Sequence, residues 1–124
     1  MTILRFDEAP VFDLSGVRIR GLAAPSRGAS EVMTYLVELA AAQQVPLHTH
    51  VHEEVSHLVS GRWTVSIAGQ DSELGPGDTA VIPAGVVHAS YTLEGDEAVI
   101  LTSMPAGTLL IRDDGERVSP PWGA

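Results

Sequence analysis

The sequence predicts an all-β fold. Glycine and proline interrupt short apolar runs at close intervals along the chain, and no long stretch keeps the 3.6-residue period of an amphipathic helix. Several runs alternate instead between apolar and polar residues, with the two-residue period of a half-buried strand. The 124 residues, 44% of them hydrophobic, are enough for one core. A single domain over residues 1–124 is therefore expected.

The first strands of this pattern lie near the N-terminus. Residues 17–20 alternate between aliphatic side chains and arginine. Residues 33–39 place a methionine, a tyrosine, a valine and a leucine on one face and Glu38 on the other. Both segments are predicted to be strands with one face toward the core.

Turns rich in glycine and aspartate separate the later strands. Residues 63–67 alternate in polarity before residues 68–71, which have the composition of a hairpin turn, and residues 74–78 form a second turn. Residues 98–101 are continuously apolar, which predicts a strand buried on both faces. Residues 108–116 are predicted to form a final hairpin.

Charge and composition exclude several classes of function. Seven basic and sixteen acidic residues give a net charge of −9, and no basic cluster is present, so nucleic acid is not expected as a partner. No apolar run approaches the ~20 residues of a membrane helix, and acidic residues near the N-terminus oppose a secretory signal. A cytoplasmic protein without a membrane partner is expected. The absence of cysteine and lysine excludes thiol and Schiff-base chemistry.

Two short segments contain candidate metal ligands. Side chains alternate along a strand, with about 6.6 Å between residues i and i+2. His48 and His50 therefore point the same way, and Glu54 joins them if the strand continues undistorted. A second segment ends on His88 after a Pro-x-Gly turn, so an antiparallel neighbour can supply a fourth ligand. These donors suit Fe, Mn, Ni, Cu or Zn rather than Ca or Mg, and one divalent transition metal is expected.

Each of these residues also has an alternative interpretation. A single histidine is more often a surface or hydrogen-bonded residue than a ligand, and only the joint spacing favours metal binding. Parity separates Glu54 from its neighbour Glu53, since only Glu54 shares the even-numbered face. His52 also has even parity and is the alternative ligand or a nearby base. His57 has the opposite parity and is expected to face outward.

Together the two segments resemble the two sequence motifs of the cupin family. The first motif, G-x5-H-x-H-x3-E-x6-G, is matched by His48, His50, Glu54 and Gly61, with Ala42 in place of the opening glycine. The second motif, G-x5-P-x-G-x2-H-x3-N, is matched by Gly77, Pro83, Gly85 and His88, with Thr92 in place of the closing asparagine. The resemblance covers residues 42–92 directly and includes all four candidate metal ligands.

This resemblance implies an antiparallel double-stranded β-helix, the jelly-roll barrel of cupins, with a metal held by His48, His50, Glu54 and His88. Three-histidine, one-glutamate cupins include dioxygenases, oxalate-degrading enzymes, sugar isomerases and polyketide cyclases, and membership alone does not choose among them. We expect a metal-dependent dioxygenase acting on a small chelating molecule, with Glu54 as the catalytic residue. The alternatives are an isomerase or cyclase, a binding or sensing module without turnover, and a structural barrel that has lost its metal.

The pocket is expected to be mixed in character rather than charged. Even-numbered positions after the ligands are mostly small and polar, namely Ser56, Ser66, Ser90 and Thr92, with the apolar Leu58 among them. Arg18 and Arg20 point inward only if Val17 and Ile19 face outward. The expected substrate is therefore a neutral or singly charged chelator.

A homodimer is also expected. The strand that follows the ligands places Val55, His57 and Val59 on its outward face, which is more apolar than a solvated barrel wall needs. Family members commonly pair through such sheet surfaces.

Overall fold

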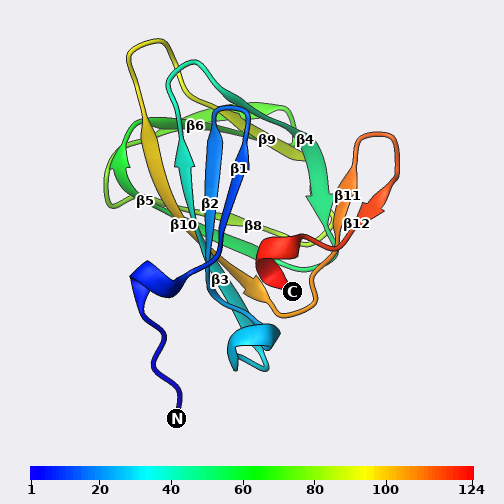
Figure 1. The fold of residues 1–124 in the computed structure, drawn as a ribbon. Coiled ribbons are helices and arrows are strands. Elements are labelled where there is room, and N and C mark those ends of the chain that lie inside the picture. The colour runs from blue at the N-terminus through cyan, green and yellow to red at the C-terminus, as the bar shows by residue number, and fades with distance from the viewer.

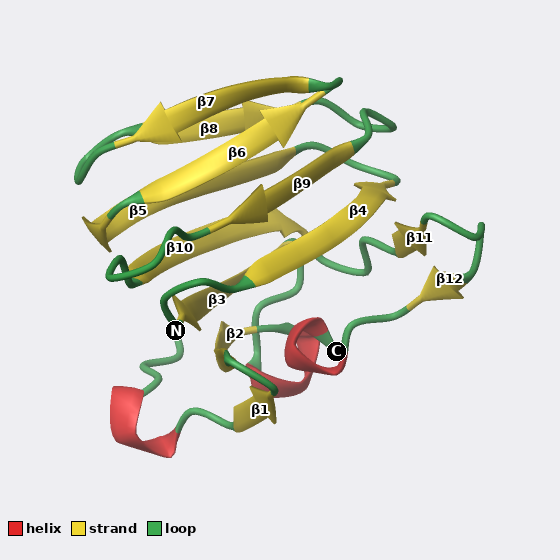
Figure 2. Ribbon diagram, turned by 90° about the horizontal axis from the view of Figure 1, so that it is seen from above, coloured by secondary structure: helices red, strands yellow, loops and turns green.

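The computed structural model describes residues 1–124 as two antiparallel sheets that face each other, each with six strands (Figure 1). The first sheet has the order β1 (Val11–Leu14), β2 (Val17–Ala23), β3 (Val32–Leu39), β10 (Ala98–Pro105), β5 (Glu54–Gly61) and β8 (Thr79–Ile82). The second has the order β12 (Arg117–Val118), β11 (Leu110–Arg112), β4 (Gln44–His50), β9 (His88–Tyr91), β6 (Trp63–Ile67) and β7 (Gln70–Leu74). The predicted all-β, jelly-roll architecture is confirmed, and Figure 2 shows its two layers.

Helical structure is limited to three short 3₁₀ turns, η1 (Phe6–Glu8), η2 (Pro25–Arg27) and η3 (Pro121–Gly123). No helix has the length and apolar character needed to cross a membrane. η3 lies beside β2 on the side of the barrel that also carries the β11–β12 hairpin (Figures 1 and 2).

The space between the sheets is filled by two buried clusters of apolar side chains. The larger contains Leu39, Leu58, Trp63, Val65, Leu74, Ala80, Ile82, Ala98 and Ile100. The smaller contains Ile19, Met33, Tyr35 and Met104. The predicted inward face of β3 is confirmed, because Met33, Tyr35 and Leu39 are all buried.

The prediction that residues 98–101 are buried on both faces is wrong. Ala98 and Ile100 are buried between the sheets, whereas Val99 and Leu101 are only partly covered on the outer face of β10. No layer of this chain packs on that outer face. The predicted hairpins are present as β6–β7 and β11–β12.

Left-handed backbone at the turns explains the motif glycines. Gly61, Gly77 and Gly85 have φ of 88°, 93° and 75°, a region that side chains with a Cβ rarely adopt. Ala42 replaces the motif's opening glycine and also has a positive φ of 56°. At Gly61 a Cβ would in addition overlap the carbonyl oxygen of Glu97.

We predict that Gly61→Ala lowers the free energy of unfolding by roughly 3 kcal/mol or more, because the new methyl group collides with rigid backbone. Gly77→Ala is the matched control. It has a similar φ but nothing within 4 Å of the added Cβ, so the expected loss is only about 1 kcal/mol. Urea denaturation measures both values, and equal losses would show that the contact with Glu97 is unimportant.

Candidate metal centre

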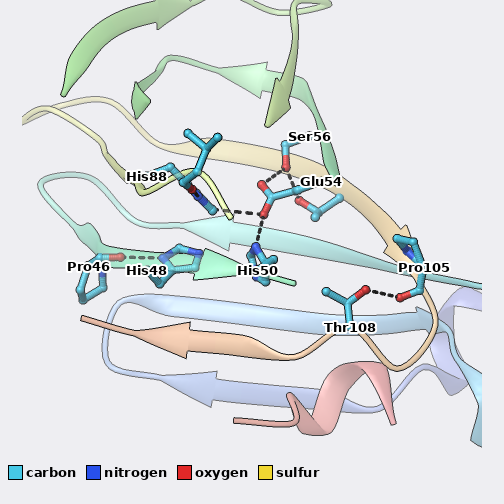
Figure 3. Close-up of polar contacts among 10 residues, drawn as sticks. Pro46, His48, His50, Glu54, Ser56, His88, Pro105 and Thr108 are labelled. Carbon is cyan, nitrogen blue, oxygen red and sulfur yellow. Dashed lines mark hydrogen bonds and ion pairs between the residues drawn. The ribbon is translucent and has the colours of Figure 1, made fainter. Parts of the chain in front are cut away.

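The four predicted metal ligands lie together between the two sheets (Figure 3). His48 and His50 lie at the end of β4, and His88 begins the neighbouring strand β9, where it directly opposes His48. Glu54 begins β5 and reaches the cluster from the other sheet. One donor atom from each of the four side chains lies within 4.8 Å of the others.

Glu54 reaches this cluster by a route that differs from the prediction. β4 ends at His50, residues 51–53 form no strand, and β5 starts at Glu54 in the opposite sheet. The continuous strand assumed in the parity argument is therefore wrong, although the residue it selected does join the cluster. His52 is exposed on the connection and does not join it. His57 faces away from the cluster, as expected.

A bulge in β4 orients the histidines. Val45 opposes Ser90 and His48 opposes His88, so three steps along β4 match two steps along β9. Pro46 lies within this irregularity, where a missing backbone N–H is tolerated. The extra residue allows Val45 and His48, which have opposite parity, to border the same inner cavity.

Backbone carbonyl groups set the tautomers of two imidazoles. Nδ1 of His48 lies 2.7 Å from the carbonyl oxygen of Pro46, and Nδ1 of His88 lies 2.9 Å from that of Val86. A carbonyl oxygen only accepts hydrogen bonds, so both Nδ1 atoms donate. In the neutral imidazoles, each Nε2 then carries a free lone pair, as metal binding requires.

The two oxygens of Glu54 have different partners. Oε2 accepts a hydrogen bond of 2.7 Å from the hydroxyl of Ser56, whose Oγ lies 2.8 Å from Oγ1 of Thr102. Oε1 lies 3.2 Å from Nδ1 of His50 and 3.5 Å from Nε2 of His88 (Figure 3). Ser56 and Thr102 therefore hold the carboxylate so that Oε1 faces the histidines. Thr102 is 46 residues from Ser56, and only the pairing of β10 with β5 reveals it.

Burial and mutual contacts set the protonation of these groups. Burial, and after it the nearby His88, lower the pKa of His48 to about 4, so His48 is neutral at physiological pH. Burial raises the pKa of the Glu54 carboxyl, but its contacts with His50 and His88 outweigh burial and hold that pKa below its ordinary value. Burial lowers the pKa of His88, and contact with Glu54 reverses this to a net increase.

The donor set fits a divalent transition metal ion. Nδ1 of His50 and Nε2 of His88 are buried, and neither forms a hydrogen bond of good geometry, which is uncommon for buried polar atoms. When neutral, His88 also presents a lone pair toward Oε1 of Glu54. Two lone pairs repel each other unless a proton or a cation lies between them, and three imidazoles with one carboxylate are donors typical of transition metals.

Two cavities meet at this cluster. The inner one, of about 70 Å³, extends into the barrel beneath His48, Glu54 and His88. The outer one, of about 260 Å³, is bordered by His48 and His50. The residues shared by both cavities are Tyr35, Val37, Val45 and His48. The candidate metal ligands can therefore be reached from the outer pocket.

Some of the predicted pocket residues are confirmed and others are not. Ser56 and Ser90 line the inner cavity. Ser66 does not, because Trp63 and Val65 occupy the inward face of β6. Thr92 supports a turn instead, since its hydroxyl donates to the carbonyl of Ala40 at 2.6 Å and accepts from the N–H of Gln43 at 3.0 Å.

The arginines of β2 do not face the pocket, in agreement with the prediction. Ile19 is buried between Arg18 and Arg20, which pair with Asp13 and Glu38. One functional candidate was missed: Arg112 of β11 lies opposite His48 and borders the outer pocket. No local signal in the sequence reveals this position, because it depends on the register between β11 and β4.

Known proteins resemble this chain in sequence and in fold. A family model described as the cupin domain matches residues 35–105, which is more than half of the chain. The chain is a cupin. Germin-like protein 3-8 from Oryza sativa subsp. japonica is 37% identical over 94 residues. These residues cover 64% of this chain but only 42% of that protein, so this cupin spans less than half the length of the curated relative.

Solved structures with different activities have the same fold. The polyketide cyclase RemF from Streptomyces resistomycificus aligns with a TM-score of 0.77 and 21% identity, over 96% of this chain and 82% of that chain. A G106A variant of salicylate 1,2-dioxygenase from Pseudoaminobacter salicylatoxidans, in complex with gentisate, aligns with a TM-score of 0.66 and 18% identity. That alignment covers 76% of this cupin and 26% of the dioxygenase. At these identities the likeness shows the fold alone.

We predict that metal occupancy falls as the pH decreases. Metal binding requires unprotonated imidazoles. The raised pKa of His88 means that protons compete there first, from near neutral pH downward, whereas His48 gains a proton only near its pKa of about 4. Equilibrium dialysis against Mn²⁺, followed by elemental analysis, should show occupancy near one per chain at pH 8 and little at pH 4.

His50→Ala and His52→Ala form the matched pair for this measurement. His50 lies within the donor cluster, whereas His52 is exposed two residues away. At pH 8 the first variant should lose most of its metal and the second should keep it. Full occupancy in His50→Ala, or in wild type at pH 4 with an intact circular dichroism spectrum, would contradict the assignment of the ligands.

Proposed function

We propose that this cupin is a metal-dependent enzyme acting on a small chelating molecule that contains oxygen, with dioxygenase chemistry favoured. The observation that carries the proposal is the convergence of His48, His50, Glu54 and His88 beside a pocket open to solvent. A divalent Fe, Mn, Ni, Cu or Zn ion held there would supply Lewis-acid chemistry, and its redox-active members would also allow reaction with O2.

The lining of the inner cavity supports a substrate with little charge. Glu54 is the only ionised side chain among its lining residues at neutral pH, apart from any proton on His88. The remaining walls are aliphatic, aromatic or hydroxyl-bearing side chains, including Val37, Ile100 and Ser90. A substrate with several carboxylates would find no positively charged side chain there beyond the metal ion and any proton on His88, so a neutral or singly charged chelator is the better match.

We assign Glu54 the catalytic role. Its contacts with the histidines hold its pKa low, so it remains ionised and is a weak base. Its negative charge then compensates the cation, and Oε1 can accept a proton only from a substrate hydroxyl that is strongly acidified. Ser56 supports this role because it holds Oε2 and thereby fixes the position of Oε1.

A cyclase or isomerase is the second candidate. The pocket beside the donor cluster is open to solvent, which suits a compound that is enolised on a Lewis-acidic metal without O2. Oxygen consumption distinguishes the two reactions. Tight binding of chelators without turnover, in aerobic and anaerobic screens, would indicate a binding or sensing module instead.

We predict that Glu54→Gln lowers turnover by roughly 100-fold, because it keeps the shape of the side chain but removes its charge and basicity. The assay uses Mn²⁺-loaded and Fe²⁺-loaded protein with a panel of diketones and dihydroxybenzenes, and records O2 uptake together with product formation. Glu53→Gln is the matched control, since Glu53 is an exposed neighbour outside the cluster. Equal turnover by Glu54→Gln and wild type would refute the catalytic role.

We also propose that two copies pair through the outer face of the first sheet. Val55 and Val81 are exposed and lie opposite each other on β5 and β8, and Val59 is exposed further along β5. Between them, Nδ1 of His57 lies 2.9 Å from Oγ1 of Thr79, so these two polar atoms already have a partner when the face is buried. A second copy would bury the apolar side chains that water now contacts.

We predict that light scattering at micromolar concentration gives about twice the single-chain mass of 13.1 kDa. Val81→Glu should yield monomers, because it places a charge within the proposed contact. Leu93→Glu is the control, since Leu93 is equally exposed but lies outside both sheets. A wild-type mass near 13 kDa would refute the dimer.

A further inference from the structure

Four parts of the chain form the walls of the outer pocket, namely strands β1 to β3, strand β4, the β11–β12 hairpin and the turn η3. Strands β1, β2 and β3 contribute Leu14, Ile19 and Tyr35 on one side, and β4 and β11 contribute the opposite side. Trp122 of η3 borders the pocket between them. Ten of the sixteen lining residues are hydrophobic, so the pocket favours a ligand with an apolar body.

The wall formed by Trp122 is closely fitted to the barrel. Its ring packs edge-on against Phe12 and Tyr35, with centroid distances of 6.1 Å in both cases. A Cβ on Gly21 would lie 3.0 Å from the carbonyl oxygen of Trp122, and a Cβ on Gly123 would overlap Sδ of Met33. Two glycines thus allow this segment to lie directly against the sheet, which gives the pocket a rigid aromatic wall.

Arg112 is the only permanently charged residue that borders the pocket. It opposes His48 in the antiparallel pair of β11 and β4, so their side chains project from the same face of the sheet. Its Nε lies 3.3 Å from Glu116 on the exposed hairpin, and such a surface pair is weak enough to exchange for a ligand anion. The pocket therefore combines metal-ligand histidines, an apolar body and one cation.

We propose that the outer pocket binds an aromatic compound with two adjacent oxygens at one end and a single carboxylate at the other. Rings pack against the apolar walls and Trp122, the oxygens face the donor cluster, and the carboxylate pairs with Arg112. A pocket of about 260 Å³ lies just below the usual ~300 Å³ of small-molecule sites, which suits about one or two rings. This inference rests on the proposed function for the position of the two oxygens, but not for the role of Arg112.

The probe is 3,4-dihydroxybenzoate, with 1,2-dihydroxybenzene as the analogue that lacks the carboxylate. Calorimetry on Mn²⁺-loaded protein should give tighter binding of the acid, by roughly tenfold. Arg112→Gln should remove this difference and leave binding of 1,2-dihydroxybenzene unchanged. Arg117→Gln is the matched control, because Arg117 opposes Ile111 and so projects from the other face of the hairpin; it should preserve the difference.

Trp122→Ala should weaken binding of both compounds. Trp122→Phe should retain most of the affinity, because an aromatic ring at this position still forms the pocket wall. Absence of binding to wild type, equal affinity for the two compounds, or an undiminished preference in Arg112→Gln would overturn the proposal. His50→Ala separates this inference from the metal-dependent function. If that variant lacks metal and binds both compounds more weakly but still prefers the acid, the role of Arg112 holds independently of the proposed metal-dependent function.

Discussion

The buried carboxylate of Glu54 is the constraint on which the arrangement of the barrel interior depends. Removing an ionised carboxylate from water costs several kcal/mol unless partners compensate it. Here the first sheet compensates one oxygen through Ser56 and Thr102, and the second sheet contacts the other through His50 and His88. One side chain thus links both sheets, so the donor cluster takes its geometry only when the sheets are correctly packed.

The larger apolar cluster extends from one end of the first sheet to the donor cluster. Ala98 of β10, a member of that cluster, pairs with Leu39 and with Gly61 at one end of the sheet. At the other end, Ser103 pairs with Val55, beside Glu54. Close packing of the cluster supplies burial that stabilises the fold. Four of its members also form walls of the inner cavity beneath the histidines, namely Trp63, Val65, Ile82 and Ile100.

A feature could be predicted from the sequence when the residues that determine it lie close together along the chain. Strand periodicity and turn composition were sufficient for the all-β fold, and motif spacing was sufficient for the four clustered side chains, because these signals are local. The alternation argument failed where it was extended from one strand to the next. It placed Ser66 in the pocket and continued β4 as far as Glu54, whereas each strand has its own register. Thr102 and Arg112 could not be found at all, since long-range pairing brings them to the site.

The candidate metal ligands and the residues that would recognise the ligand also come from different parts of the chain. All four donors come from residues 42–92, the segment that carries the family motifs. The walls of the outer pocket come largely from outside it, with Leu14, Arg112 and Trp122 supplied by the two ends of the chain. Substitutions there can change the ligand that fits without disturbing the donors. One barrel can therefore serve many reactions, and the motifs that identify a cupin leave its substrate open.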